Sequence, residues 1–293
     1  MAFTALSPGS SLSGFVAVIT KDNLPTSALD TGTLSCLNGG GDWRFSTDIN
    51  GATQLPCEIV ACVTNASAGN TEFVAWVRFP TYAIGTRSVY AFWNKAGQSQ
   101  PLFGAAFGRN AVWVDFRAVY HLNEIANTTP GGYKDSTGNG YDGTGVNMSE
   151  ANRTLPSGLV GSGFNGTDES ISLPLSIFPT AAQSEYTVIY QAQPDTLATD
   201  SRVFSLGNTG NDDDVIVSWM DSGGASGGWA LNTKNSGNNL TLGTSSNNAQ
   251  AGRWDFVANK FTSSAAFIRV NGTQSATGAI VGGGVGRTID SAK

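Results

Sequence analysis

Charge is scarce in this sequence. Only 13% of the 293 residues are charged, and histidine occurs once, at His121. An average soluble domain has about 25% charged residues. The net charge is −6, and no cluster of Lys and Arg is present. The positive surface of a nucleic-acid-binding protein is therefore missing, and we expect no nucleic acid among the partners.

Long hydrophobic runs are also missing. No stretch of about 18 uncharged apolar residues occurs, so we expect no transmembrane helix and no membrane partner. The first residues, MAFTALSPGSSLSGFVAVITK, lack the basic start and the continuous apolar segment of a secretory signal. A protein of this kind that works outside a cell would have to arrive there by another route, such as inside a virus particle released by lysis.

Cysteine is rare and confined to the first quarter of the chain, at Cys36, Cys57 and Cys62. An odd number of cysteines without CxxC spacing argues against a zinc site or a disulfide framework. We expect reduced, mostly buried thiols. A Cys57–Cys62 bridge is the alternative.

Turn-forming residues are abundant, with 37 glycines and many Asn, Ser and Thr residues. Between the turns, apolar residues alternate with period two, which is typical of β-strands. The strands expected on this pattern are 15–20, 72–79, 88–93, 186–190, 215–220, 254–258 and 266–270. The sequence therefore predicts an all-β chain.

A change of composition suggests the domain boundary. The strand-rich block 1–100 is followed by a Gly-, Gln- and Pro-containing linker at 101–112, and a second strand-rich block opens at 113 and runs to 293. We therefore predict two β-sandwich domains in tandem.

The first block resembles the β-domain family DUF2341. The segments that carry the resemblance are GDWRF at 41–45, LPCEI at 55–59, WVRFP at 76–80 and VYAFW at 89–93. Their order and spacing match over about a hundred residues.

The second block resembles the laminin-G/concanavalin A-like jelly roll. It contains VYHLNE (119–124), DSTGNGYDGT (135–144), GLVGSGFNGTDESISLP (158–174), YTVIYQAQP (186–194), RWDFVANK (253–260) and FIRVNGT (267–273). Family members usually close the sandwich with an I-D-E-V-R strand, of which only Thr288–Asp290 is a trace. The resemblance implies an improvised closure or an edge strand from another chain.

The stretch AVWVDFRAVYHLNE at 111–124 places His121 between Asp115 and Glu124. We interpret it as the entry strand of the second sandwich, with His121 hydrogen-bonded inside that sandwich or to residues 135–139. The alternative is a general base, but no serine or cysteine nucleophile motif accompanies the histidine.

Glycoside hydrolysis is the enzyme class that the jelly roll most often suggests. It requires two carboxylates flanking the scissile bond. The E-x-D-x-x-E strand of jelly-roll glucanases does not occur here. We predict no catalytic residues and no enzymatic activity.

Calcium is the one candidate cofactor. The segment NTGNDDD at 208–214 supplies Asp212 and Asp214 as candidate oxygen ligands. Consecutive aspartates point in alternate directions and cannot all converge on one ion, so a solvated, turn-capping role is the alternative.

Glycan binding requires an exposed aromatic side chain beside polar groups. Trp229 follows the turn segment SGGASGG at 222–228, and we predict that it is exposed and could stack on a sugar. The other tryptophans lie in strand patterns and are expected in the core.

Tandem DUF2341 and laminin-G-like modules are familiar on bacteriophage particles, so the resemblance implies that setting. We predict a structural protein of a phage virion, exposed at its surface as a capsid decoration, tail fibre or appendage. Its expected partners are other virion proteins, copies of itself and, as an addition, host or environmental glycans. The alternative is a secreted or cell-surface bacterial carbohydrate-binding, lectin-like adhesion module.

Overall fold

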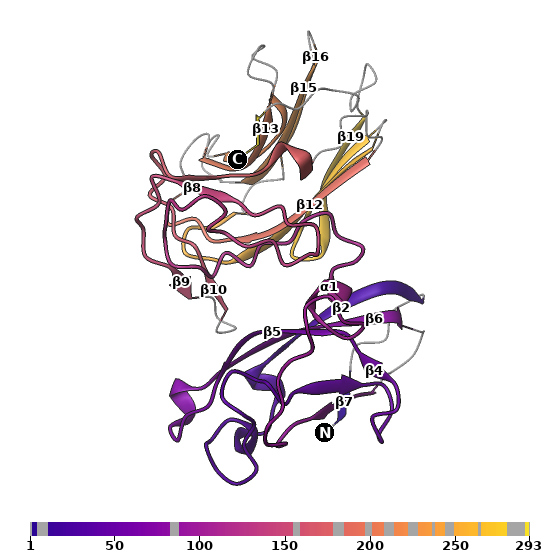
Figure 1. Ribbon diagram of the computed structural model, residues 1–293. Helices are drawn as coiled ribbons and strands as arrows, with labels where there is room; N and C mark the ends of the chain where they lie inside the picture. Colours follow the sequence, from indigo (N-terminus) through magenta and orange to yellow (C-terminus); the bar gives the residue numbers. More distant parts are fainter. Residues whose placement is uncertain are drawn as a thin grey trace. The chain divides into compact units, whose positions relative to one another are not determined.

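The computed structural model describes residues 2–4, 11–82, 88–154, 159–177, 185–196, 201–207, 214–221, 228–235, 238–243, 249–262, 265–279 and 291–292. Antiparallel strands dominate this part of the chain, and its helices are short (Figure 1). The prediction of an all-β chain is confirmed. Contacts divide the chain into two compact units, Met1–Ala126 with Gly131–Asp142 and Glu150–Gly163, and Asn127–Pro130 with Gly143–Ser149 and Phe164–Lys293.

The first unit contains two main sheets. One has the order β1 (Ala2–Thr4), β7 (Ser88–Phe92), β3 (Arg44–Ser46), β4 (Gln54–Leu55), and the other has the order β2 (Leu12–Thr20), β6 (Glu72–Tyr82), β5 (Cys57–Val63). A small hairpin pairs β9 (Arg153–Thr154) with β10 (Val160–Gly161). The short helices of this unit are η1 (Lys21–Asn23), η2 (Thr26–Ala28), η3 (Ala68–Asn70) and α1 (Arg109–Val112).

One core joins the two main sheets of the first unit. Phe45 on β3 and Phe73 on β6 belong to the same buried cluster, and the Trp43 ring lies between them, with centroids 6.1 Å from Phe45 and 4.6 Å from Phe73. Alternation along β6 buries Phe73, Ala75 and the residues that follow at period two, as expected when one face of a strand packs on a core.

The second unit also contains two main sheets. One has the order β12 (Glu185–Ala192), β17 (Asp255–Thr262), β18 (Ala265–Val270), β19 (Thr273–Ala279). The other has the order β16 (Asn238–Gly243), β15 (Gly228–Asn235), β14 (Asp214–Asp221), β13 (Ser201–Gly207), β20 (Ser291–Ala292). The remaining elements are the pair β8 (Thr144–Val146) and β11 (Ser170–Ser172), and the single turn η4 (Leu175–Ile177).

A short strand near the last residues lies at one edge of a sheet of the second unit. Ser291 and Ala292 pair antiparallel with Gly207 and Leu206 of β13, which forms a short strand at that edge. The family-like trace at Thr288–Asp290 lies outside the described residues.

All seven predicted strands lie in observed strands: they fall in β2, β6, β7, β12, β14, β17 and β18. The expected strand at 111–124 is wrong. This segment forms a single bridge between Tyr120 and Asp135, and Leu122 has a positive φ of 55°, which interrupts an extended backbone.

The contact-based division also differs from the predicted linker at 101–112. Residues 113–126 belong to the first unit. The reason is specific, since the side chains of Trp113 and His121 both donate hydrogen bonds to Glu58 on β5.

Membrane crossing by a helix finds no support in the described ranges, where no helix is long and apolar enough to span a bilayer.

The strand β17 offers a matched test of the second core. It carries two phenylalanines on opposite faces: Phe261 is 1% exposed and Phe256 is 48% exposed. We expect Phe261→Ala to lower the free energy of unfolding by about 3–5 kcal/mol because it opens a cavity. Phe256→Ala should cost less than about 1 kcal/mol. Urea unfolding read by hydrogen exchange of β12 and β17 peptides checks this, and equal effects would contradict the assigned strand faces.

Candidate functional site

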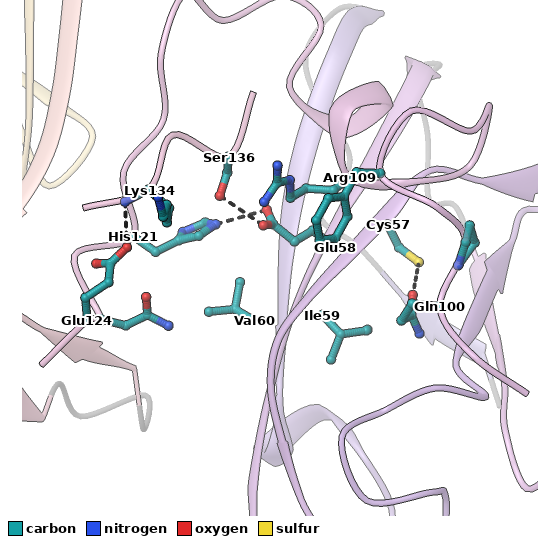
Figure 2. A pocket seen from close by; sticks show the side chains of 13 residues that line it. Cys57, Glu58, Ile59, Val60, Gln100, Arg109, His121, Glu124, Lys134 and Ser136 are labelled. Atoms are coloured by element: carbon teal, nitrogen blue, oxygen red, sulfur yellow. Dashed lines mark hydrogen bonds and ion pairs between the residues drawn. The ribbon is translucent and has the colours of Figure 1, made fainter. Parts of the chain in front are cut away.

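A hollow on the first unit gathers several ionisable side chains, among them His121 and Glu124, to which the sequence drew attention. Its volume is about 280 Å³, and its lining includes Glu58, Arg109, His121, Glu124 and Lys134. Figure 2 shows these side chains from close by, with His121 and Ser136 converging on Glu58 from one side. All lining residues belong to the first unit.

Strand β5 supplies the floor of this hollow. It is an edge strand, because β6 pairs with it on one side only. Segment 97–136 covers that edge, and the Cys57 backbone N–H donates to the Phe107 carbonyl at 3.2 Å. A register shift lies between Ile59 and Ala61. Such a bulge redirects side chains next to a site, and here Glu58, Ile59 and Val60 all line the hollow.

Glu58 accepts three side-chain hydrogen bonds. The indole Nε1 of Trp113 donates to its Oε2 at 2.6 Å, and Nε2 of His121 lies 2.9 Å from the same oxygen. The hydroxyl of Ser136 donates to Oε1 at 3.0 Å. Because an ionised carboxylate only accepts, the His121 proton that faces Glu58 lies on Nε2. A buried charge of this kind is tolerated only when hydrogen bonds replace the lost water.

The histidine is also held by aromatic rings. Its imidazole lies 6.1 Å from the Trp76 ring with an angle of 14° between the planes, and 5.8 Å from Trp113. His121 is hydrogen-bonded, as predicted, but the predicted partners are wrong, because it bonds Glu58 on β5 of the first unit and neither the second sandwich nor residues 135–139.

The geometry of the three groups is not that of a hydrolytic triad. In such a triad the histidine takes the proton of the serine, and the carboxylate orients the histidine. Here Ser136 and His121 both donate to the same carboxylate. The cluster therefore links three segments of the chain, and the serine hydroxyl donates to the carboxylate and not to the histidine.

A carboxylate-centred turn places Ser136. The Asp135 carboxylate accepts from the backbone N–H groups of Val119, Thr137 and Tyr141 at 3.0, 3.0 and 3.1 Å. The Ser136 backbone N–H donates to the Val119 carbonyl at 2.8 Å. The acidic turn that the sequence presents as DSTGNGYDG is thus structural and orients its neighbour into the hollow.

The same turn anchors Lys134. Its ammonium donates to Asp142 Oδ2 at 2.8 Å and to the Gly131 carbonyl at 2.7 Å. Partial burial raises the pKa of Asp142, but the Lys134 ammonium and the Asp135 backbone N–H outweigh it, so the pKa lies below its ordinary value. Asp142 therefore stays ionised at neutral pH and keeps Lys134 in place.

The rim of the hollow carries polar atoms with no internal partner. Glu124 Oε1 accepts the Lys134 backbone N–H at 2.7 Å, whereas Glu124 Oε2 and Arg109 Nε are buried atoms that meet no hydrogen-bond partner within the described structure. The Arg109 guanidinium lies 4.0 Å from the ring centre of Phe103. Phe103 itself is 61% exposed, so the rim combines an open aromatic ring with hydrogen-bonding groups.

The predicted exposure of Trp229 is wrong. Its side chain is 1% exposed and belongs to the core of the second unit. The indole Nε1 donates to Asp255 Oδ2 at 2.9 Å, and the Tyr190 ring lies 5.8 Å away. Trp229 is the second residue of β15, and it packs in the same buried cluster as Leu231, two positions further along the strand. A buried indole offers no face to a sugar.

The predicted calcium ligands fall at the edge of the described structure. Asp212 lies outside the described residues, and Asp214 begins β14, with its side chain not described. In the part of the chain that the structure describes, no group of three or more His, Cys, Asp and Glu side chains could hold a metal ion. The calcium site at 208–214 stays a prediction.

Arg109, Phe103 and Glu58, which line the hollow, were not among the site residues predicted from the sequence. The apolar pair Leu102 and Phe103, inside a segment taken for a linker, is the signal that could have pointed to it. Glu58 gave no signal, because its partners lie 55, 63 and 78 positions away.

Comparisons with known proteins find little. No protein-family model matches the chain, and no curated protein matches it. Among solved structures, it is similar to domain 4 of AbnA, a GH43 extracellular arabinanase from Geobacillus stearothermophilus, in complex with arabinotriose. The identity is 19% and the TM-score 0.41, over 54% of this chain and 74% of that one. This degree of similarity assigns no function.

The contribution of the Glu58 cluster (Glu58 with Trp113, His121 and Ser136) to stability can be measured. We expect Glu58→Ala to lower the free energy of unfolding by about 2–4 kcal/mol, because the buried donors of Trp113, His121 and Ser136 lose their acceptor. The matched control is Glu72→Ala, at the exposed start of β6, which should change stability by less than about 0.5 kcal/mol. Urea denaturation followed by circular dichroism measures both. A Glu58→Ala protein as stable as the control would show that the cluster is not holding the segments together.

Proposed function

We propose that this protein is a surface-exposed, non-catalytic carbohydrate-binding protein, and that the hollow on the first unit is its binding site. One observation carries the proposal: an exposed aromatic ring, Phe103, stands at the rim of a polar hollow in which Glu58 already accepts three hydrogen bonds from the protein. Sugars are recognised by aromatic rings that cover their apolar C–H faces and by planar polar groups that bond their hydroxyls.

The charges of the hollow favour a neutral ligand. Two cationic side chains, Arg109 and Lys134, stand beside two carboxylates, Glu58 and Glu124. Lys134 is already paired with Asp142, and Glu58 already accepts a hydrogen bond from Ser136. An anion or a cation would meet a group of its own sign, whereas hydroxyl groups can donate to Glu124 and accept from Arg109 or from the exposed Asn123.

The arrangement also supports binding without turnover. A glycosidase needs two carboxylates that can act on opposite sides of the scissile bond. Both oxygens of Glu58 already accept hydrogen bonds, from the indole of Trp113, the imidazole of His121 and the hydroxyl of Ser136. Glu124 would stand alone, and one carboxylate is enough to bind a hydroxyl but not to run the reaction.

A second candidate is the structural role in a phage virion that the resemblance to DUF2341 and laminin-G-like modules implies. The observation in its favour is the density of exposed apolar side chains on one stretch of the first unit. Within residues 102–116 these are Leu102, Phe103, Phe107, Val114 and Phe116. Exposed apolar surface of this kind marks contacts with other chains. Both roles place the protein outside a cell, on a virion or on a bacterial surface.

The binding proposal is tested on the full chain. We expect it to retain neutral oligosaccharides on a glycan array, and Phe103→Ala to weaken binding of the best of them about tenfold or more. Asn123→Ala should weaken it several-fold. Phe107→Ala is the matched control, because this aromatic is exposed on the same segment but does not line the hollow. Isothermal titration calorimetry gives the affinities.

Two results would contradict the proposal. One is a full chain that retains no glycan, and the other is binding that Phe103→Ala and Phe107→Ala weaken equally. A chain that binds no glycan but sediments with phage particles, or forms a homo-oligomer burying on the order of 1,000 Å² or more, would favour the second candidate.

A further inference from the structure

Two sulfur atoms from distant parts of the first unit lie next to each other. Cys36 Sγ and Cys62 Sγ are 3.5 Å apart, although 26 positions separate them in the chain. The sequence drew attention to a Cys57–Cys62 bridge, and the structure brings a different pair together. The three thiols are free in this structure.

The backbone holds this pair in place from both sides. The Cys36 N–H donates to the Ala28 carbonyl at 2.9 Å, which fixes the loop after η2. Cys62 lies in β5 opposite Phe73 of β6, and its carbonyl accepts the Gly39 N–H at 2.9 Å. Backbone hydrogen bonds thus hold both cysteine positions within the fold.

A glycine keeps the loop close to the second sulfur. Gly40 has a φ of +74°, and a Cβ at this position would lie 3.1 Å from Cys62 Cβ and 2.8 Å from Ile59 Cγ2. Any larger residue would push the loop away from β5. Gly40 thus keeps the loop close to the Cys62 side chain.

The two thiols differ in acidity. Either sulfur can donate the hydrogen bond between them. This interaction with Cys62 outweighs the burial that opposes ionisation, so the pKa of Cys36 lies below its ordinary value. The same hydrogen bond, together with burial, raises the pKa of Cys62. Cys36 is accordingly the group that ionises first, and thiolates are the reactive form of cysteine.

We propose that Cys36 and Cys62 form a redox-active dithiol that closes to an intramolecular disulfide when it meets a small peroxide. The Cys36 thiolate attacks one oxygen of hydrogen peroxide, gives a sulfenic acid and releases hydroxide. The Cys62 sulfur then attacks the Cys36 sulfur, the S–S bond forms, and the sulfenic oxygen leaves as water with the Cys62 proton. Two thiols and one peroxide thus give one disulfide and two waters, and the peroxide is reduced.

The third cysteine is a built-in contrast. Cys57 lies on the same strand as Cys62, but its thiol faces Gln100 Oε1 at 3.9 Å, and burial raises the pKa of Cys57 to about 12. It shares the burial of the pair without a neighbouring sulfur among the described atoms. Cys57 should therefore stay a thiol under conditions that oxidise the pair.

The crosslink would act on the hollow described above. It ties the 36–41 loop to β5, which carries Glu58 and Ile59 into the floor of that hollow. The Gly40 carbonyl also accepts the side-chain amide of Gln100, another lining residue. Oxidation would thus fix three parts of the lining on one another, whatever ligand the hollow takes.

The experiment uses the purified full chain, first reduced and then exposed to hydrogen peroxide in the folded state. We expect the intact mass to fall by about 2 Da, the two hydrogens of the thiols, and dithiothreitol to restore it. Trypsin releases Cys36 in the peptide 22–44 and the other two cysteines together in 45–78. A second cleavage after Glu58 separates Cys57 from Cys62, so non-reducing mass spectrometry identifies the bonded pair.

Variants and stability complete the test. Cys57→Ser should keep the crosslink, whereas Cys36→Ser and Cys62→Ser should each lose it. Closing a loop of this length should raise the midpoint of thermal unfolding of the first unit by about 5–10 °C relative to the reduced protein. This measurement needs only the wild-type chain and stands if a serine variant fails to fold.

Two outcomes would overturn the proposal. The first is a bond that includes Cys57 or joins two chains. The second is a Cys36 that gains about 16 or 32 Da of oxygen while Cys62 stays a free thiol. Neither outcome bears on glycan binding, since the array experiment is run on the reduced protein.

Discussion

The buried carboxylate of Glu58 is the constraint on which the first unit depends. A carboxylate on an edge strand would normally face water, but the segment that follows β7 covers it. The covering segment compensates for the lost water with three donors, from Trp113, His121 and Ser136. The donors and the carboxylate depend on each other. If the segment leaves β5, Glu58 loses its three donors, and the three donors lose their acceptor. This reciprocity holds an irregular stretch of chain, with almost no strand structure, in one place.

That constraint explains which parts of the fold could be predicted from the sequence. Strands such as 72–79 and 266–270 were predictable, because the alternation of apolar residues is a local signal. The stretch 111–124 alternates in the same way, yet it forms no strand. Its polar groups find side-chain partners on β5, and no neighbouring strand offers a ladder. An alternating pattern reports that one face is buried, and it does not report whether a sheet or a set of side chains buries it.

Trp229 shows the complementary error. A glycine-rich turn before a tryptophan suggests an exposed ring, but the turn ends where β15 begins, and the first strand positions point into the core. There the indole N–H needs an acceptor, and Asp255 supplies it while Arg253 and Asn271 bind the remaining lone pairs. A buried aspartate opposite a buried tryptophan is a pairing across two sheets, which no local pattern contains. The exposed aromatic ring that lines the hollow lies in the other unit, at Phe103.

The scarcity of charge limits how the hollow on the first unit can recognise a ligand. With few ions on the surface, long-range attraction cannot select a ligand, and recognition has to come from contact: a ring at the rim, hydrogen-bonding side chains and a rigid floor. Rigidity is then the property that matters most, because a mobile binding surface loses conformational entropy when a ligand orders it, and this loss lowers the affinity. β5 is that floor, and two different interactions restrain it, the Glu58 cluster at one end and the Cys36–Cys62 pair at the other. The first consists of hydrogen bonds within the fold, whereas the second would be made by an oxidant and broken by a reductant, so the stiffness of the hollow would follow the redox conditions in which the protein works.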